Sequence, residues 1–218
     1  MKKQLICFAL LGVLLSGCAS NESSTTKKSE TKEAETQVST STEETTTSTS
    51  STSNLLMDDP DFHGVSEGTG DQTAQIVDRV EYATDWSDAS WADVTVGIDQ
   101  VQVVQLEEYR DYNDATYQGI VFVHFTEKSE KQDVSVYPQQ AEITLNTDES
   151  VTGSYMMPRW DGALDKGESK DGWAAFGVNK LGAVSDITEL KISFMGTNQA
   201  ATDPDEKTHT YETTIELK

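Results

Sequence analysis

The sequence is poor in cysteine, proline and positive charge. It contains two cysteines, Cys7 and Cys18, and four prolines among 218 residues. So few cysteines exclude the disulfide framework that is typical of small secreted proteins. Lys and Arg number 16 against 38 Asp and Glu, so the formal net charge is −22 at pH 7. Because phosphate backbones repel an acidic surface, nucleic acid is excluded as a partner.

Long apolar runs and helical patterns are scarce as well. The run Leu5–Leu15 has eleven residues, whereas a membrane-spanning helix needs about 20. It follows the positive start Met1-Lys2-Lys3 and therefore fits the apolar region of a secretory signal peptide, about 7–15 residues long. In the rest of the chain, no window of eleven or more residues repeats apolar side chains at helical spacing, which predicts little α-helix.

The tetrapeptide Leu15-Ser16-Gly17-Cys18 resembles the lipobox of bacterial lipoproteins, a large apolar residue and two small residues before a cysteine. The resemblance implies that residues 1–17 are a lipoprotein signal peptide and that Cys18 receives a diacylglycerol. Two or more acyl chains such as those of palmitate anchor a protein stably to a membrane. We therefore expect the mature chain, with a charge of −24 after loss of Lys2 and Lys3, on the outer face of a Gram-positive cell membrane, extending into the cell wall.

Two segments separate this cysteine from the folded part. In residues 18–54, 21 side chains are Ser or Thr, and the run Ser39–Ser53 has no apolar residue. Such a composition cannot bury enough apolar surface to offset its ordering entropy, which predicts a disordered tether. Residues 55–72 are transitional, because they hold apolar side chains without periodicity. Leu55, Leu56, Met57 and Phe62 could either dock on the domain or stay free.

Residues 73–218 alternate between apolar and polar side chains, the pattern of half-buried β-strands. The apolar set Val94, Val96 and Ile98 changes phase after Asp99-Gln100 to Val101 and Val103. A second change follows at Val104 and Leu106. Because a one-residue shift sends every side chain to the other face, we expect a bulge or a change of sheet at these points.

The remaining alternation predicts about eight strands in all. The run Ile120–Phe125 is apolar on both faces, which indicates a central strand. Turn residues separate the strands, and many short strands with such turns indicate an all-β, antiparallel immunoglobulin-like β-sandwich. The other strands are expected around residues 76–82, 134–136, 141–145, 151–157, 173–178, 190–194 and 211–217, and the turns at Asn113-Asp114, Asn146–Asp148, Asp161-Gly162, Lys166-Gly167 and Asp203-Pro204.

The segment Leu164–Val178, LDKGESKDGWAAFGV, resembles a hairpin of uncharacterised immunoglobulin-like surface lipoproteins of Firmicutes, which are related in fold to a small secreted immunogenic antigen of mycobacteria. Thr116–Ile143 resembles the same family, although its central strand ends in Thr126–Ser129 where the family often has an asparagine-rich turn. The resemblance implies a fold and no catalytic residues. The matching positions of the hairpin are Leu164, Gly167, Glu168, Ser169, Gly172, Trp173 and Phe176.

Residues for catalysis or cofactor binding form no recognisable motif. Of the histidines His63, His124 and His209, only His124 lies inside an apolar strand. It could serve as a ligand or base, or be a packed histidine with one hydrogen bond. There is no G-x-S-x-G motif and no phosphate-binding loop. We predict no catalytic residue, no cofactor and no metal site.

Acidic clusters leave calcium as an alternative partner, since loop carboxylates can supply its oxygen ligands. We interpret them as solvated loops instead. They lie at Asp58–Asp61, Asp111–Asp114, Asp148-Glu149 and Asp203–Glu206.

The segment Met156–Gly162 is the candidate ligand-binding site, because it places Arg159 and Trp160 at a turn. Both residue types are enriched in interface anchors, although Trp160 could instead belong to the core. We predict a non-enzymatic binding or accessory domain whose partners are the membrane, through the anchor, and an envelope or extracellular protein or glycan. The alternatives are a structural or immunogenic surface protein without a ligand, and an envelope enzyme in which His124 meets carboxylates in a deep cleft.

Overall fold

The computed structural model describes residues 54–60, 74–111, 113–153 and 156–218. The predicted signal peptide, Cys18, the tether up to residue 53, Phe62 and His63 lie outside these ranges. None of the helices in the described residues is long and apolar enough to cross a membrane. They are short 3-10 turns: η1 (Leu56–Asp58), η2 (Pro138–Gln140), η3 (Val184–Asp186) and η4 (Pro204–Glu206).

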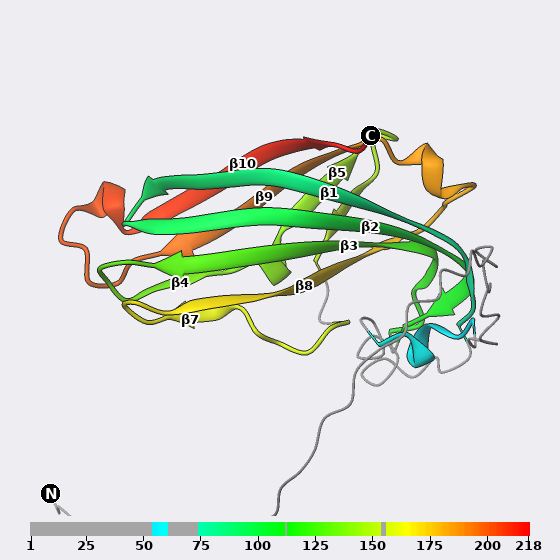
Figure 1. Cartoon of the computed structure of the whole chain (residues 1–218), viewed down its shortest axis with the longest axis horizontal. Coiled ribbons are helices and arrows are strands. Elements are labelled where there is room, and N and C mark those ends of the chain that lie inside the picture. Colours follow the sequence, from blue (N-terminus) through cyan, green and yellow to red (C-terminus); the bar gives the residue numbers. More distant parts are fainter. Residues whose placement is uncertain (1–53, 61–73, 112, 154–155) are drawn as a thin grey trace, which may run out of the picture. The chain divides into compact units, whose positions relative to one another are not determined.

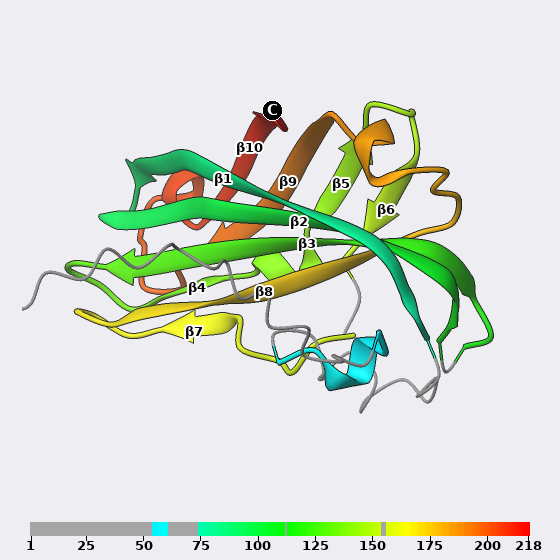
Figure 2. The ribbon, with the colours of Figure 1, turned by 45° about the vertical axis from the view of Figure 1, so that its right-hand side comes forward.

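Two antiparallel sheets make up the domain, which confirms the predicted all-β sandwich (Figure 1). The first sheet has the strand order β1-β2-β3-β8, and the second has the order β6-β5-β9-β4-β7 with β10 paired to β9. Strands of the second sheet run obliquely behind the first (Figure 2). The bounds are β1 (Ile76–Trp91), β2 (Val94–Arg110), β3 (Thr116–Ser129), β4 (Val134–Val136), β5 (Glu142–Leu145), β6 (Ser150–Thr152), β7 (Gly162–Leu164), β8 (Ser169–Val178), β9 (Glu189–Thr197) and β10 (Thr208–Glu216).

The main core lies between the sheets, and its β2 side chains confirm the first predicted phase change. Ile98 pairs with Phe125 and Gln100 pairs with His124, so Asp99 is the extra residue of a bulge. Val96 and Ile98 before the bulge, and Val101 and Val103 after it, all belong to the core between the sheets. The bulge restores these side chains to the inner face.

The second predicted phase change, at the step from Val103 to Val104, is not a bulge. β2 pairs with β3 without a register shift from Gln100 to Gln105, and the next shift lies between Gln105 and Tyr109. Val104 and Leu106 instead join a second apolar cluster, together with Ile120 and Phe122 of β3, that is separate from the core between the sheets. A strand buried on both faces has consecutive apolar residues, and we misread that pattern as a change of phase.

The segment before β1 supplies part of this second cluster. Leu56 of η1 is fully buried in it. The Leu56 amide donates to the Ala74 carbonyl at 2.9 Å, and the Ile76 amide donates to the Asn54 carbonyl at 2.7 Å. Arg79 pairs with the buried Asp59 at 2.5 Å. Residues 55–60 of the segment predicted to be transitional thus contact the sandwich through both apolar and polar groups. Asn54, predicted to end the disordered tether, contacts it as well.

Two strand predictions need correction. The strand expected over residues 151–157 is only β6, which ends at Thr152. Asp161-Gly162 was predicted as a turn, yet Gly162 begins β7 and pairs with Val136. Its φ of +105° is open to glycine without a steric penalty, so a turn-forming residue opens a strand here.

The β1–β2 hairpin is a feature that sequence analysis missed. Trp91 pairs with Val94, and the two residues between them, Ala92 and Asp93, have φ values of 55° and 51°. Such two-residue turns favour Asn-Gly, because both residues need a positive φ. The next loop supports the turn: the Gln132 side chain donates to the Ala92 carbonyl at 2.8 Å, and Lys131 pairs with Asp93 at 2.8 Å.

We expect Ala92→Gly to raise the free energy of unfolding by about 0.5–1 kcal/mol. A left-handed alanine costs about 1–2 kcal/mol, and the larger unfolded-state entropy of glycine offsets part of the gain. Urea unfolding followed by tryptophan fluorescence measures the change. Ala163→Gly in β7, where the alanine is exposed and φ is ordinary, is the matched control and should be destabilising. If both variants changed the free energy of unfolding in the same direction, the result would contradict this prediction.

Candidate functional site

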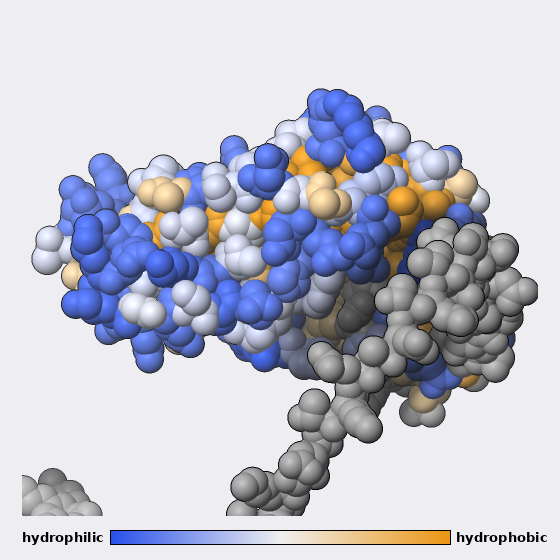
Figure 3. Space-filling view, in the orientation of Figure 1, coloured by the Kyte–Doolittle hydropathy of each residue, from blue (hydrophilic) through white to orange (hydrophobic). Residues whose placement is uncertain are grey.

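A polar hollow of about 610 Å³ lies on the face of the first sheet that points away from the second sheet. We call it the His124 hollow. Figure 3 shows hydrophilic residues over the end of the domain that holds the β1–β2 hairpin, with hydrophobic residues in a band toward the opposite end. The residues that line the hollow are Thr95, Asp99, His124, Thr126, Glu127, Lys128, Glu130, Ser169, Lys170 and Asp171.

His124 of β3 is held between two carboxylates. Its Nδ1 lies 2.7 Å from Asp99 Oδ1, and its Nε2 lies 3.3 Å from Asp171 Oδ2. The imidazole also packs at 54° against the Trp173 ring, with a centroid distance of 4.8 Å. The His124 side chain is 18% exposed, whereas Asp99 and Asp171 are 55% and 67% exposed. The histidine is therefore fixed, and the two carboxylates still face solvent.

The β-bulge explains how Asp99 reaches the histidine. Without the extra residue, Asp99 and Gln100 would lie on opposite faces of the sheet, because strand side chains alternate. With the extra residue, Asp99 and Gln100 of β2 both lie beside His124 of β3. On the other side, Trp173 is the direct pairing partner of His124, and Asp171 pairs with Thr126 and so lies diagonal to the histidine. Bulges that aim one side chain in this way are frequent near functional sites.

Alternation also sorts the lining residues by face. Asp171 and Ser169 of β8 share the outer face with Trp173, while Ala174 and Phe176 belong to the core. Glu127 and Lys170 are on the inner face, where Lys170 donates to the Ala163 carbonyl at 2.8 Å. Lys128 and Glu130 form an ion pair with each other at the rim. The groups offered to solvent are thus mainly carboxylates and hydroxyls.

The enzyme alternative required His124 to meet carboxylates in a deep cleft. The carboxylates are present, but both are more than half exposed. Both ring nitrogens of His124 face carboxylate oxygens, so neither is directed at a substrate proton. Within the ranges that the structure describes, no group of three or more His, Cys, Asp or Glu side chains is placed to hold a metal ion. Asp99 and Asp171 can accept hydrogen bonds from a ligand in the hollow. The Ser169 hydroxyl can both donate a hydrogen bond to such a ligand and accept one from it.

Behind the hollow, inside the sandwich, lies a buried ionisable pair. The Glu127 side chain is fully buried, and its Oε2 lies 3.5 Å from Lys170 Nζ. Neither Glu127 oxygen has a hydrogen-bond partner among the described residues. Loss of solvation raises the pKa of Glu127 to about 8, although Lys170 opposes the shift. Burial also raises the pKa of Tyr211, whose hydroxyl is likewise without a described partner.

The predicted ligand-binding residues Arg159 and Trp160 are separate from the His124 hollow. The Trp160 indole donates to the Trp173 carbonyl at 2.9 Å and packs against the main core. A Cβ at Gly172 of β8 would lie 2.5 Å from the Trp160 ring, so the indole packs directly against the backbone of this glycine. Arg159 is 59% exposed, with its Nε 3.4 Å from buried Asp161. These contacts give Trp160 a packing role, and ligand binding by the two residues stays a prediction.

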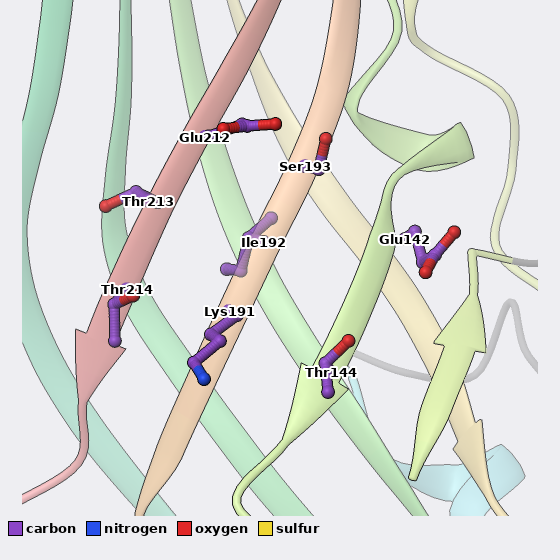
Figure 4. Close-up of a pocket in the computed structure, with 8 residues that line it drawn as sticks. All are labelled: Glu142, Thr144, Lys191, Ile192, Ser193, Glu212, Thr213 and Thr214. Atoms are coloured by element: carbon purple, nitrogen blue, oxygen red, sulfur yellow. The ribbon is translucent and has the colours of Figure 1, made fainter. Parts of the chain in front are cut away.

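A second hollow, of about 510 Å³, lies over β5, β9 and β10 of the other sheet. Figure 4 shows its side chains projecting from three neighbouring strands: Glu142 and Thr144 from β5, Lys191, Ile192 and Ser193 from β9, and Glu212, Thr213 and Thr214 from β10. None of these residues is aromatic. The one ion pair recorded for them joins Lys191 to Glu189 at 3.9 Å. The Thr144 hydroxyl also lies within hydrogen-bond distance of the Ser150 hydroxyl, at 2.9 Å.

Sequence analysis singled out His124 but missed both of its partners. Asp99 was marked only as the point of a phase change, and Asp171 only as part of the segment LDKGESKDGWAAFGV. The expectation of a packed histidine with a single hydrogen bond is wrong, since His124 contacts two carboxylates. The phase change at Asp99 was the available signal, because a bulge next to a strand histidine can bring a carboxylate to it.

Neither a protein-family model nor a curated protein matches this chain. Among solved structures, a functionally unknown protein from Listeria monocytogenes is similar with a TM-score of 0.47 and 12% identity, over 71% of this chain and 93% of that one. A lipoprotein candidate from Bacillus subtilis has a TM-score of 0.29 and 15% identity, over 66% of this chain and 36% of that one. A secreted protein from Mycobacterium tuberculosis has a TM-score of 0.32 and 12% identity, over 54% and 86%. All three scores are below 0.5, so they identify neither family nor function.

Proposed function

We propose that this chain is a lipid-anchored surface protein that presents a non-enzymatic, immunoglobulin-like binding domain to the cell envelope. The observation that carries the proposal is Leu15-Ser16-Gly17-Cys18, placed between an apolar run and a Ser/Thr-rich segment. Two acyl chains on Cys18 would hold the protein at the membrane. Residues 19–53 would form the tether, and a flexible coil of this length spans roughly 30–35 Å, which would place the domain in the wall layer.

Binding, rather than catalysis, is supported by the arrangement around His124. Its two ring nitrogens are occupied by carboxylates, and the carboxylates themselves remain exposed. The partner is an extracellular or envelope protein or glycan that the domain meets through a polar surface. A net charge of −22 for the whole chain also keeps the domain from adhering to anionic lipid headgroups.

The anchor is tested by expressing the full chain in a Gram-positive host with radiolabelled palmitate. We expect Cys18→Ala to abolish the label. The variant should either be released from the membrane fraction into the medium or accumulate as an unprocessed precursor. Cys7→Ala, in the segment to be removed, is the matched control and should leave the label unchanged. A label that survives Cys18→Ala, or that is lost in Cys7→Ala instead, would overturn the proposal.

A further inference from the structure

We infer that the His124 hollow binds a hydroxyl-rich, uncharged glycan, with Asp99 and Asp171 as the residues that accept its hydroxyl hydrogens. The inference deepens the proposed function by naming the class of ligand and the surface that meets it. It rests on four features of the hollow: its acceptors, their fixed positions, the neighbouring indole and its size.

The acceptors are two carboxylates aimed at the same opening. Each uses one oxygen toward His124, at 2.7 and 3.3 Å. Each keeps a second oxygen, and both side chains are more than half exposed. Neighbouring hydroxyls of a sugar ring are hydrogen-bond donors that such carboxylates accept, and hydrogen bonds to charged groups are the stronger kind.

The positions of these acceptors are set before any ligand arrives. His124 is 18% exposed and is held from both sides, and the Trp173 ring packs against it. The β-bulge at Asp99 places one carboxylate and the β3–β8 register places the other. A preorganised site loses less conformational entropy on binding. The hollow over β5, β9 and β10 lacks such a clamp.

The remaining lining explains why the ligand is a glycan rather than a simple cation. Thr95, Thr126 and Ser169 add hydroxyls that both donate and accept, which suits a ligand made of hydroxyls. Trp173 is not one of the lining residues, but its half-buried ring packs against His124 beside the hollow. The described residues contain no group of carboxylates and histidines placed to enclose a metal ion. The volume of about 610 Å³ falls in the usual range for organic ligands, about 300–1,000 Å³.

The test uses residues 19–218, the mature chain without Cys18, and isothermal titration with three probes: the hexasaccharides of β-1,4-glucose, α-1,4-glucose and β-1,4-N-acetylglucosamine. We expect at least one probe to bind with a Kd of about 1 mM or lower. Asp99→Asn and Asp171→Asn should each weaken that binding by about 10- to 100-fold, the size expected for a lost charged hydrogen bond. Glu212→Gln, on the outer face of the other sheet, is the matched control and should bind like the unaltered chain.

Circular dichroism and urea unfolding show whether each variant is folded, and both aspartates are exposed enough for their replacement to be tolerated. Three results would overturn the inference: no binding of any hexasaccharide, binding that the two aspartate variants leave unchanged, or binding of Ca²⁺ or hexalysine alone that these variants abolish. Because the probe is soluble and the chain lacks Cys18, these outcomes are independent of whether the anchor proposal holds.

Discussion

Glu127→Gln should stabilise the domain at alkaline pH and leave its stability at acid pH almost unchanged. The Glu127 carboxyl is buried opposite Lys170, and its pKa is raised from 4.5 to about 8 by loss of solvation. Between these two values the folded chain keeps a proton that the unfolded chain releases. The free energy of unfolding therefore falls as pH rises through this window and levels off above about pH 8.

The size of this change in the free energy of unfolding follows from the difference between the two pKa values. Each pKa unit corresponds to 1.36 kcal/mol, so the shift from 4.5 to about 8 amounts to about 5 kcal/mol. Glutamine has the shape of the protonated acid and cannot ionise. The difference in unfolding free energy between Glu127→Gln and the unaltered chain should thus be near zero at pH 4 and approach about 5 kcal/mol at pH 9.

Urea unfolding at several pH values, followed by tryptophan fluorescence, measures this difference. Many other carboxylates titrate in a chain of charge −22, but their contribution is common to both proteins and cancels. Glu142→Gln is the control, because Glu142 is exposed on β5, and its profile should run parallel to that of the unaltered chain. A parallel profile for Glu127→Gln as well would show that folding does not raise the pKa of this carboxyl.

Leu56→Ala should lower the free energy of unfolding by about 2–5 kcal/mol, the usual cost of removing a fully buried leucine side chain. Leu56 precedes β1 by twenty residues, yet it is fully buried in the apolar cluster that includes Val104, Leu106 and Phe122. Its loss would leave a cavity over this face of the first sheet. The same argument predicts that a chain beginning at residue 73 is less stable than one beginning at residue 54.

Met57→Ala is the matched control for this prediction, since Met57 belongs to the same 3-10 turn and is only partly buried. We expect its effect to be clearly smaller in the same urea experiment. If Leu56→Ala and Met57→Ala were equally mild, residues 54–60 would not be part of the folded unit. Hydrogen exchange of the Leu56 and Ile76 amides, which bond to Ala74 and Asn54, gives a second readout of the same contact.

The sequence predicted well where structure depends on nearest neighbours along the chain. Strand alternation identified the all-β sandwich, and the phase change at Asp99 identified a bulge that the pairing of Ile98 and Gln100 confirms. The prediction failed at the step from Val103 to Val104, because consecutive apolar residues fit either a bulge or a strand covered on both faces. Only the presence of Leu56 and Ile120 on the second face decides between them.

By itself, the sequence determined the local properties of this protein: alternating strands, positive-φ turns at Asp114, Asp148 and Gly167, strong acidity and a cysteine preceded by an apolar run. These follow from the side chains and the backbone preferences of short segments. The tertiary structure decided that Asp99 and Asp171 meet at His124, and that Glu127 is buried opposite Lys170. Those encounters join residues 25 to 47 positions apart, and they depend on strand register, which arises only when the sheets pair and pack.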